Sequence, residues 1–380
     1  RRRLHEKCPP ELRGWEWRHL ARRADAAAHV LAGHTAAVTC VALDPTGRLA
    51  VSGADDGTAR VWSTADGALA CPPLAAHDTS VQAVAFSADG QRVTTFGGPA
   101  HANMRTWDAR TGALVGDKSL ADYAAHSIAL SPDGERMAFG TADGTIKILA
   151  AASGLERGSI EAHPGRLVAD LEFAPDGAHL VSGAADGSLA LWDLAGSSAD
   201  DGPVWSAVSP GEPVLSVAFS RNGARVAAGL EGGGIREHDA ATGALLREFA
   251  AADGDSGGHG GDVEDLAYAA DGTLASASID KTLRLWPAAR GEAGEPSVLL
   301  GHDRAVRAVA IVGGRIVSGS EDATVRVWRP DGASAVARWT GPDDYVSAVS
   351  LARDGTVLAG TAFLGTVALI DGQRAVTVKA

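Results

Sequence analysis

A short turn signature recurs eight times along the chain, every 41 to 49 residues. The copies read DPTG, SADG, SPDG, APDG, SRNG, AADG, VGG and ARDG. Their last residues are Gly47, Gly90, Gly134, Gly177, Gly223, Gly272, Gly314 and Gly355. Apolar runs stand on both sides of the turns, as in VLSVAF before SRNG, and this pattern indicates a β-hairpin because glycine adopts the positive φ that the turn needs. Eight hairpins at one period predict an all-β repeat architecture.

Each hairpin is followed by a second turn and a third strand, as in DDG before TARVW or ADG before SLALW. A variable loop and a weaker fourth strand complete the period. Gly-His precedes the repeat at Gly33-His34 and Gly301-His302, and Trp-Asp ends it at Trp107-Asp108 and Trp192-Asp193. These motifs resemble the WD-repeat β-propeller family over residues 29 to 380. We therefore expect an all-β fold, an eight-bladed propeller over residues 28–380, with a seven-bladed ring as the alternative.

Two segments compete for the outer strand of the last blade. AHVLAG at 28–33 has the pattern of the strand that the family borrows to close its ring, and RAVTVKA at 374–380 also fits, through the turn Asp371-Gly372. We expect the N-terminal strand to close the ring, because pairing the first and last segments leaves no frayed sheet edge.

Four repeats contain a His, a Ser, an Asp and a Trp at matching positions. These four tetrads are His34, Ser52, Asp56 and Trp62; His163, Ser182, Asp186 and Trp192; His259, Ser276, Asp280 and Trp286; and His302, Ser318, Asp322 and Trp328. The resemblance implies a buried chain of hydrogen bonds from the indole through the hydroxyl and the imidazole to the carboxylate. Ser, His and Asp also form the catalytic triads of hydrolases. Four regularly spaced copies favour a structural role over a catalytic one, since a nucleophile needs one open pocket with an oxyanion hole.

The resemblance also implies a binding surface, because partners of the family bind mainly on the top face around the central channel. The top-face positions carried over are Asp55, Gln82, His126, Glu231, Glu264, Ile279, Arg307, Glu321 and, at the start of the eighth repeat, Tyr345. Four of the nine are acidic and Arg307 is basic, so we expect a basic or mixed peptide as the ligand. The alternative for any one of these residues is a solvated loop end with no partner.

Residues 1–27 form a basic segment that differs from the acidic remainder. PPELRGWEWRHLARRAD predicts a helix from about 10 to 24, with Gly14 as a weak point and with arginines in the last turn. Trp15 and Trp17 are expected to cover part of the propeller. The string CPPELRGWEWRHL resembles the connector before WD repeats in large bacterial signalling proteins, often Ser/Thr kinases. That resemblance implies an upstream domain joined covalently to this chain.

The formal net charge of −13 argues against a general affinity for nucleic acid or anionic lipid. No apolar run is long enough to span a membrane, and the N-terminus lacks a secretory pattern. The three cysteines, Cys8, Cys40 and Cys71, favour a reducing, cytoplasmic compartment. We expect no cofactor.

Two patterns suggest a metal site. In DGDSGGHGGDVE at 253–264, Asp253, Asp255, Gly258 and Glu264 fall on calcium-loop positions, but Gly257 stands where a ligand belongs and no helix flanks the loop. Of the twelve histidines, five occupy repeat positions and the rest form no H-x-x-x-H pair. We therefore expect no metal.

Two classes of function follow. The first is a non-catalytic protein-interaction scaffold or sensor module of a larger bacterial signalling protein. The second is a propeller enzyme with a cofactor or metal site in the central channel, for which His126 with Glu264 and Arg307 is the one suggestion in the sequence.

Overall fold

The fold comes from a computed structural model of the chain. The structure describes residues 27–97, 103–119, 125–151, 155–194, 202–209, 211–251, 258–288, 296–312 and 314–328, and the strands 346–351, 357–362, 366–371 and 374–379. The chain divides into two compact units, Arg1–Gly332 and Ala333–Ala380. Every regular element in the described residues is a β-strand, and none of these residues forms a helix that could cross a membrane.

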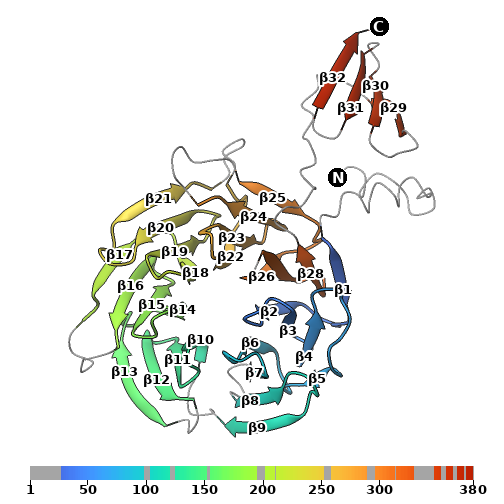
Figure 1. Cartoon of the computed structure of the whole chain (residues 1–380). Coiled ribbons are helices and arrows are strands. Elements are labelled where there is room, and N and C mark those ends of the chain that lie inside the picture. The colour runs from blue at the N-terminus through green and yellow to red at the C-terminus, as the bar shows by residue number, and fades with distance from the viewer. Residues whose placement is uncertain are drawn as a thin grey trace. The chain divides into compact units, whose positions relative to one another are not determined.

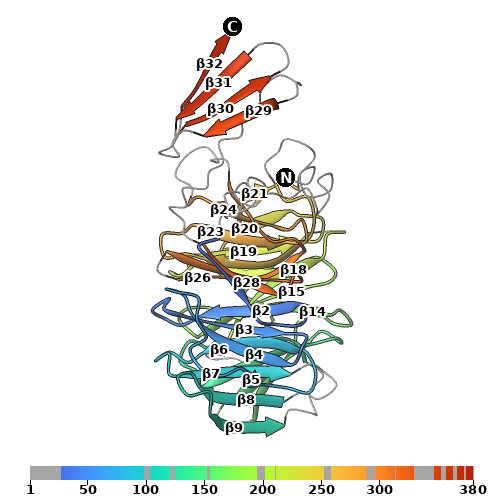
Figure 2. The ribbon, with the colours of Figure 1, turned by 90° about the vertical axis from the view of Figure 1, so that its right-hand side faces the viewer.

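The first unit contains seven four-stranded antiparallel sheets arranged as blades around a central channel (Figure 1). The first blade comprises β2 (Val38–Leu43), β3 (Leu49–Ala54), β4 (Thr58–Ser63) and β5 (Leu74–Ala75). The second comprises β6 (Val81–Phe86), β7 (Arg92–Gly97), β8 (Asn103–Asp108) and β9 (Leu114–Ser119). The third comprises β10 (Ala125–Leu130), β11 (Arg136–Thr141), β12 (Thr145–Ala150) and β13 (Glu156–Glu161). Figure 2 shows the first and second blades side by side.

The next three blades repeat this order. The fourth comprises β14 (Val168–Phe173), β15 (His179–Ala184), β16 (Ser188–Asp193) and β17 (Trp205–Val208). The fifth comprises β18 (Val214–Phe219), β19 (Arg225–Leu230), β20 (Ile235–Asp239) and β21 (Leu245–Phe249). The sixth comprises β22 (Val263–Tyr268), β23 (Leu274–Ser278), β24 (Thr282–Trp286) and β25 (Ser297–Leu300).

The seventh blade joins the two ends of the ring. It comprises β26 (Val306–Val312), β27 (Arg315–Ser320), β28 (Thr324–Trp328) and β1 (His29–Ala32). β1 pairs antiparallel with β28, with His29 opposite Val327 and Ala32 opposite Thr324. The inner strands of neighbouring blades contact one another around the channel, including β26 with β2. The prediction that the N-terminal strand closes the ring therefore agrees with the pairing of β1.

The predicted count of eight blades is wrong, because the ring has seven. The eighth repeat forms a sheet of its own in the second unit, with β29 (Val346–Leu351), β30 (Val357–Ala362), β31 (Thr366–Asp371) and β32 (Arg374–Lys379) in chain order. β32 pairs with β31 and fills the outer position of that sheet. Both candidate closing segments thus have a partner, and the strand that seemed surplus belongs to the separate sheet.

No helix, and so no counterpart of the predicted N-terminal helix, occurs among the described residues. The residues predicted to form it, about 10 to 24, lie outside the described residues, as do Trp15 and Trp17. The described part of the chain begins at residue 27 and enters β1 almost at once. The fold class is therefore an all-β propeller of seven blades.

The turn between the first and second strands needs a residue with positive φ and an acceptor for its backbone N–H groups, and the first blade shows both. Gly47 has a φ of +68°, a region that favours glycine. In the same turn the Asp44 carboxylate accepts the N–H groups of Thr46 (3.2 Å) and Leu49 (2.6 Å). Such a turn holds the inner strand and the next strand in one register.

The hydrophobic core lies between the blades. One cluster joins Val51, Val61 and Leu74 of the first blade to Val93 and Trp107 of the second. Each blade therefore buries its two faces against its neighbours, which makes stability depend on an unbroken ring.

Candidate functional site

The two faces of the ring carry different loops. We call the top face the one that carries the loops before the inner strands and the turns between second and third strands. There Asp55 donates its N–H to the carbonyl of Ala37 (2.9 Å), and Glu321 makes the equivalent bond to Ala305 (3.0 Å). The bottom face carries the turns between first and second strands, such as the one at Gly47.

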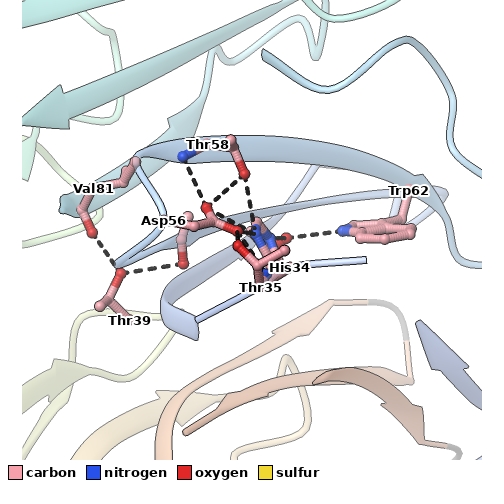
Figure 3. A network of polar contacts seen from close by, with 9 residues as sticks. His34, Thr35, Thr39, Asp56, Thr58, Trp62 and Val81 are labelled. Carbon is pink, nitrogen blue, oxygen red and sulfur yellow. Dashed lines mark hydrogen bonds and ion pairs between the residues drawn. The ribbon is translucent and has the colours of Figure 1, made fainter. Parts of the chain in front are cut away.

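The first predicted tetrad forms a continuous chain of hydrogen bonds (Figure 3). Trp62 Nε1–H donates to Ser52 Oγ (2.8 Å), and the serine hydroxyl in turn donates to His34 Nε2 (2.7 Å). His34 Nδ1 lies 3.2 Å from Asp56 Oδ2, so the imidazole proton belongs on Nδ1. The chain ties the third strand, the second strand and the top-face loop together.

Two of the other three predicted tetrads have the same order, and in the third a serine stands between the histidine and the aspartate. Nε1 of Trp192, Trp286 and Trp328 donates to the serine of its own blade at 2.9, 2.8 and 2.8 Å. His259 and His302 reach their aspartates at 2.9 and 2.8 Å. In the fourth blade His163 Nδ1 instead donates to Ser188 Oγ (2.7 Å), which donates to Asp186.

The tetrads are buried, and their surroundings determine the protonation states of the histidine and the aspartate. Ser52, Ser182, Ser276 and Ser318 have no exposed surface. Burial lowers the pKa of His34 although Asp56 acts to raise it, so the imidazole is neutral at neutral pH. Burial acts to raise the pKa of Asp56, but hydrogen bonds from Thr58 and Thr35 outweigh it and lower that pKa to about 2. A hydroxyl with no access to substrate cannot act as a nucleophile, so the tetrads act as structural fasteners.

The second blade contains a fifth chain of this kind, which the sequence analysis did not predict. Trp107 Nε1–H donates to Thr95 Oγ1 (3.0 Å), and Thr95 lies 3.0 Å from His77 Nε2. His77 Nδ1 lies 2.6 Å from Asn103 Oδ1. Thr replaces Ser and Asn replaces Asp, and a longer loop before Asn103 hides the spacing. The usable signal was a His 30 residues before a repeat-ending Trp, because the corresponding separation is 28 residues in the first blade and 29 in the fourth.

A different network occupies the fifth blade, where the sequence lacks the tetrad. Glu237 has no exposed surface and bonds Arg225 (3.2 Å), Arg247 (2.5 Å) and the hydroxyl of Tyr268 (2.6 Å). Because Tyr268 belongs to β22, this carboxylate joins the fifth blade to the sixth. Burial acts to raise the pKa of Glu237, but the bonds from Arg247 and Tyr268 outweigh it and lower it.

Three of the predicted top-face residues form one ion cluster. Arg307 Nη1 lies 2.8 Å from Glu264 Oε2, and Arg307 Nη2 lies 2.5 Å from Glu321 Oε1. Glu264 is on β22, Arg307 is on β26 and Glu321 is in the turn after β27, so the cluster spans the sixth and seventh blades. Two carboxylates against one guanidinium leave it with a net negative charge.

The remaining predicted residues lie apart from that cluster. Asp55 accepts a bond from Ser80 (2.6 Å), which accepts one from Gln82 (3.1 Å), in the first and second blades. Glu231 and Ile279 are exposed in the turns of the fifth and sixth blades. Tyr345 lies outside the described residues.

The enzyme interpretation rested on His126 together with Glu264 and Arg307. The structure pairs Glu264 with Arg307, but His126 is exposed on β10 in the third blade, whose inner-strand neighbours are β6 and β14. The three residues therefore do not form one site. The second hypothesis has no geometric support in the described residues.

A cavity of about 480 Å³ opens on the top face where the seventh blade meets the first. It is lined by Thr35, Ala36, Ala37, Asp303, Arg304, Glu321, Asp322 and Ala323. Asp303 is exposed and donates its backbone N–H to Asp322 (3.0 Å), so the tetrad fixes its position. Three carboxylates and one arginine make the walls predominantly negative.

Three more carboxyl groups lie on the inner strands. Asp170 accepts the N–H of Val217 (2.8 Å), Glu172 that of Phe219 (2.6 Å), and Asp265 that of Val309 (2.7 Å). Asp170 and Glu172 are on β14 and bond β18, and Asp265 is on β22 and bonds β26, so each carboxyl joins two blades. Burial raises the pKa of Asp170 to about 7 and that of Glu172 to about 8, and it raises that of Asp265 strongly.

These shifts give a testable dependence of stability on pH. The pKa of Glu172 is higher in the folded chain than its value of 4.5 in the unfolded chain, so its contribution is complete below pH 4.5 and is lost as the pH rises through about 8. Glu172→Gln retains a neutral acceptor. We expect it to unfold like the wild type at pH 4 and to be more stable at pH 9 by on the order of 4 kcal/mol, measured by urea denaturation. Equal stability at pH 9 would contradict the assignment.

The predicted calcium loop is only partly described. Asp253, Asp255 and Gly257 lie outside the described residues, and Glu264 pairs with Arg307. Within the described ranges no group of three or more His, Cys, Asp or Glu side chains is placed to hold a metal ion.

Five segments of the chain match the family model "WD domain, G-beta repeat". The matched segments are residues 27–63, 118–148, 154–193, 255–287 and 295–329. The chain therefore carries WD repeats. The matches include the four blades with complete tetrads and the third blade, and the first match also includes β1, the closing strand.

The curated relatives resemble this chain over parts of longer proteins. "Ribosome biogenesis protein ytm1" of Aspergillus fumigatus is 29% identical over 38% of this chain and 30% of its own length. "Autophagy-related protein 16" of Arabidopsis thaliana is 33% identical over 29% of the chain and 21% of its own length. "Telomerase protein component 1" of Rattus norvegicus is 29% identical over 86% of the chain and 12% of its own length. The chain thus spans less than a third of each relative.

Proposed function

We propose that this chain is a non-catalytic scaffold that binds a basic or mixed peptide segment on its top face, at the cavity between the seventh and first blades. The observation that carries the proposal is the set of carboxylates around that cavity. Asp303 is exposed, Glu321 presents a second carboxyl oxygen beyond its bond to Arg307, and the tetrad holds Asp322 in place. The WD repeats support a scaffold role, since propellers of this family typically bind protein partners.

Charge favours a basic ligand over an acidic one. The chain has a formal net charge of −13, and Arg307, which pairs with Glu321 of the cavity wall, is shared with a further carboxylate, Glu264. A Lys or Arg side chain entering the cavity would gain charge-assisted hydrogen bonds, and the surrounding field would speed its association. Arg304 at the cavity wall would accommodate an acidic residue of the same segment, which is why a mixed peptide also fits.

A peptide-selection experiment tests this function. We expect a random peptide library, panned against the full chain, to yield peptides enriched in Lys and Arg. Asp303→Asn and Glu321→Gln should each weaken binding of the selected peptide about tenfold, equivalent to about 1.4 kcal/mol. Arg304→Ala should strengthen it. The measurement is calorimetric titration.

Glu135→Gln provides the matched control, because Glu135 is exposed in a turn on the bottom face. It should bind the peptide like the wild type. Selected peptides without basic residues, or equal weakening by Glu135→Gln, would contradict the proposal.

We also propose the wider role inferred from the sequence: a sensor part of a larger bacterial signalling protein, in the cytoplasm, joined to an upstream domain and without affinity for nucleic acid. The string CPPELRGWEWRHL supports the first part, and the free thiols of Cys40 and Cys71 support a reducing compartment. The full open reading frame and the localisation of a tagged protein test these points. An extracellular location would contradict them.

A further inference from the structure

A second cavity, of about 290 Å³, lies at the bottom mouth of the channel. Five blades contribute to it, through the ends of their inner strands and the turns that follow. The lining residues are Leu43, Pro45, Ala85, Phe86, Ser87, Ala88, Leu130, Ser131, Pro132, Arg221 and Val312. The volume is at the lower end of the range for small-molecule sites, roughly 300–1,000 Å³. Eight of the eleven lining residues are apolar, Ser87 and Ser131 are polar, and Arg221 is the one charged residue among them.

Arg221 crosses the mouth of the channel. It belongs to the turn between β18 and β19 in the fifth blade, and its Nη2 donates to the carbonyl of Ile311 in the seventh blade (3.1 Å). That bond uses one of the five N–H donors of a guanidinium and fixes the direction of the others. The residue is exposed, so the fork is accessible to a ligand in the cavity.

The fold does not require an arginine at this position. The same position of the turn is occupied by Pro45, Ala88, Pro132, Pro175 and Ala270 in other repeats. Within the ring the fifth blade alone has a long cationic side chain at this position, and the eighth repeat, which forms the separate sheet, has Arg353 there. In the ring, Arg221 therefore places a charge where the other blades have none.

The nearest inner-strand carboxyl does not neutralise this charge at neutral pH. Glu172 stands at the register position that six other inner strands fill with alanine, including Ala85 at the cavity wall. Burial raises its pKa to about 8, although Arg221 acts to lower it. The carboxyl is thus mainly protonated at neutral pH and does not balance the charge of the guanidinium, which lines the same cavity as Leu43, Phe86 and Leu130.

We propose that the bottom mouth of the channel binds a carboxylate carried on a short apolar stem. Arg221 receives the carboxylate through its fork of N–H donors, and Phe86, Leu43 and Leu130 contact the stem. The ligand is either a small branched-chain acid or the free C-terminus of a peptide that ends in an apolar residue. This site is separate from the top-face cavity and does not depend on the function proposed for that cavity.

Calorimetric titration of the full chain with 4-methylpentanoate tests the proposal. We expect binding of the acid and at least tenfold weaker binding of the neutral 4-methylpentanamide. Arg221→Ala should weaken binding of the acid at least tenfold, and it should fold because Ala88 and Ala270 occupy the same turn position. Arg92→Ala, at another exposed bottom-face arginine that does not line the cavity, should leave binding unchanged.

Two further experiments distinguish a small acid from a peptide C-terminus as the ligand and test whether the apolar stem contributes to binding. N-acetyl-Gly-Gly-Leu with a free carboxylate, compared with its amide, shows whether a peptide C-terminus also enters. Ala85→Leu narrows the cavity while keeping Arg221, and it should weaken binding of the acid as much as Arg221→Ala does. Absence of binding by both acids, equal binding of acid and amide, an unaffected Arg221→Ala, or displacement by an equal concentration of inorganic phosphate would overturn the proposal.

Discussion

Leu31→Ala is expected to lower the free energy of unfolding by about 2–5 kcal/mol, the range for removing a buried leucine side chain. Leu31 is 2% exposed in β1 and packs against Val317, Val325 and Val327 of the seventh blade. Loss of that contact loosens the strand that closes the ring, so all seven blades should unfold together at lower urea concentration. Urea denaturation followed by tryptophan fluorescence measures the change.

Val30→Ala is the matched control, because Val30 is adjacent in β1 but 47% exposed. It should change the free energy by less than about 0.5 kcal/mol. A second variant ends the chain after residue 332 and so deletes the separate sheet. A seven-bladed ring should then unfold at the same urea midpoint, whereas an eight-bladed ring would be opened and strongly destabilised.

Trp328→Ala is expected to destabilise the chain by about 3–5 kcal/mol. Trp328 is fully buried in the core between the sixth and seventh blades. Ser318→Ala should cost about 1–3 kcal/mol, because the indole N–H loses its acceptor and His302 loses a donor inside the core. Thermal and urea unfolding give both values.

A double-mutant cycle with Trp328→Phe and Ser318→Ala isolates the hydrogen bond itself. The two residues are in contact, so we expect a coupling of about 0.5–3 kcal/mol. Ser206→Ala, at an exposed serine of β17, should have almost no effect. A Ser318→Ala variant with unchanged stability and a lost hydrolytic activity would reverse the structural interpretation of the tetrads.

The sequence predicted the blades well because the information that defines a blade is local. A hairpin needs a glycine at a positive φ and two apolar runs, as around Gly47, and both are readable in six to twelve residues. The strand order within each sheet then follows from the short turns. The prediction of the closing strand used a further physical argument, the avoidance of an unpaired sheet edge.

The number of blades in the ring could not be predicted from such local signals. The turn at Gly355 has the same local signal as the others, and hairpin signals do not say which sheets join one ring. Closure depends on the long-range pairing of β1 with β28 and on the contact of β26 with β2. The eighth repeat lacks the His and Trp of the tetrads, but the third and fifth repeats lack them too and are blades of the ring, so this lack did not identify the repeat that stands apart.

The positions of the candidate site residues in the repeats could be predicted one by one, but the contacts between them could not. Family positions located Glu264, Arg307 and Glu321, yet only the angular order of the blades brings them together and leaves His126 apart. The buried Glu237 network was missed because a Glu in a strand ordinarily indicates a solvated face. Its sign was Arg247 directly opposite Glu237 in the neighbouring strand.

Hydrogen–deuterium exchange of the full chain with and without a library-selected basic peptide tests the central claim most directly. The account predicts slower exchange at backbone amides of residues 35–37, 303–304 and 321–323, which line the top-face cavity, with unchanged exchange at the turn near Gly47 on the bottom face. Protection confined to the bottom face or to the outer strands at saturating peptide would contradict it.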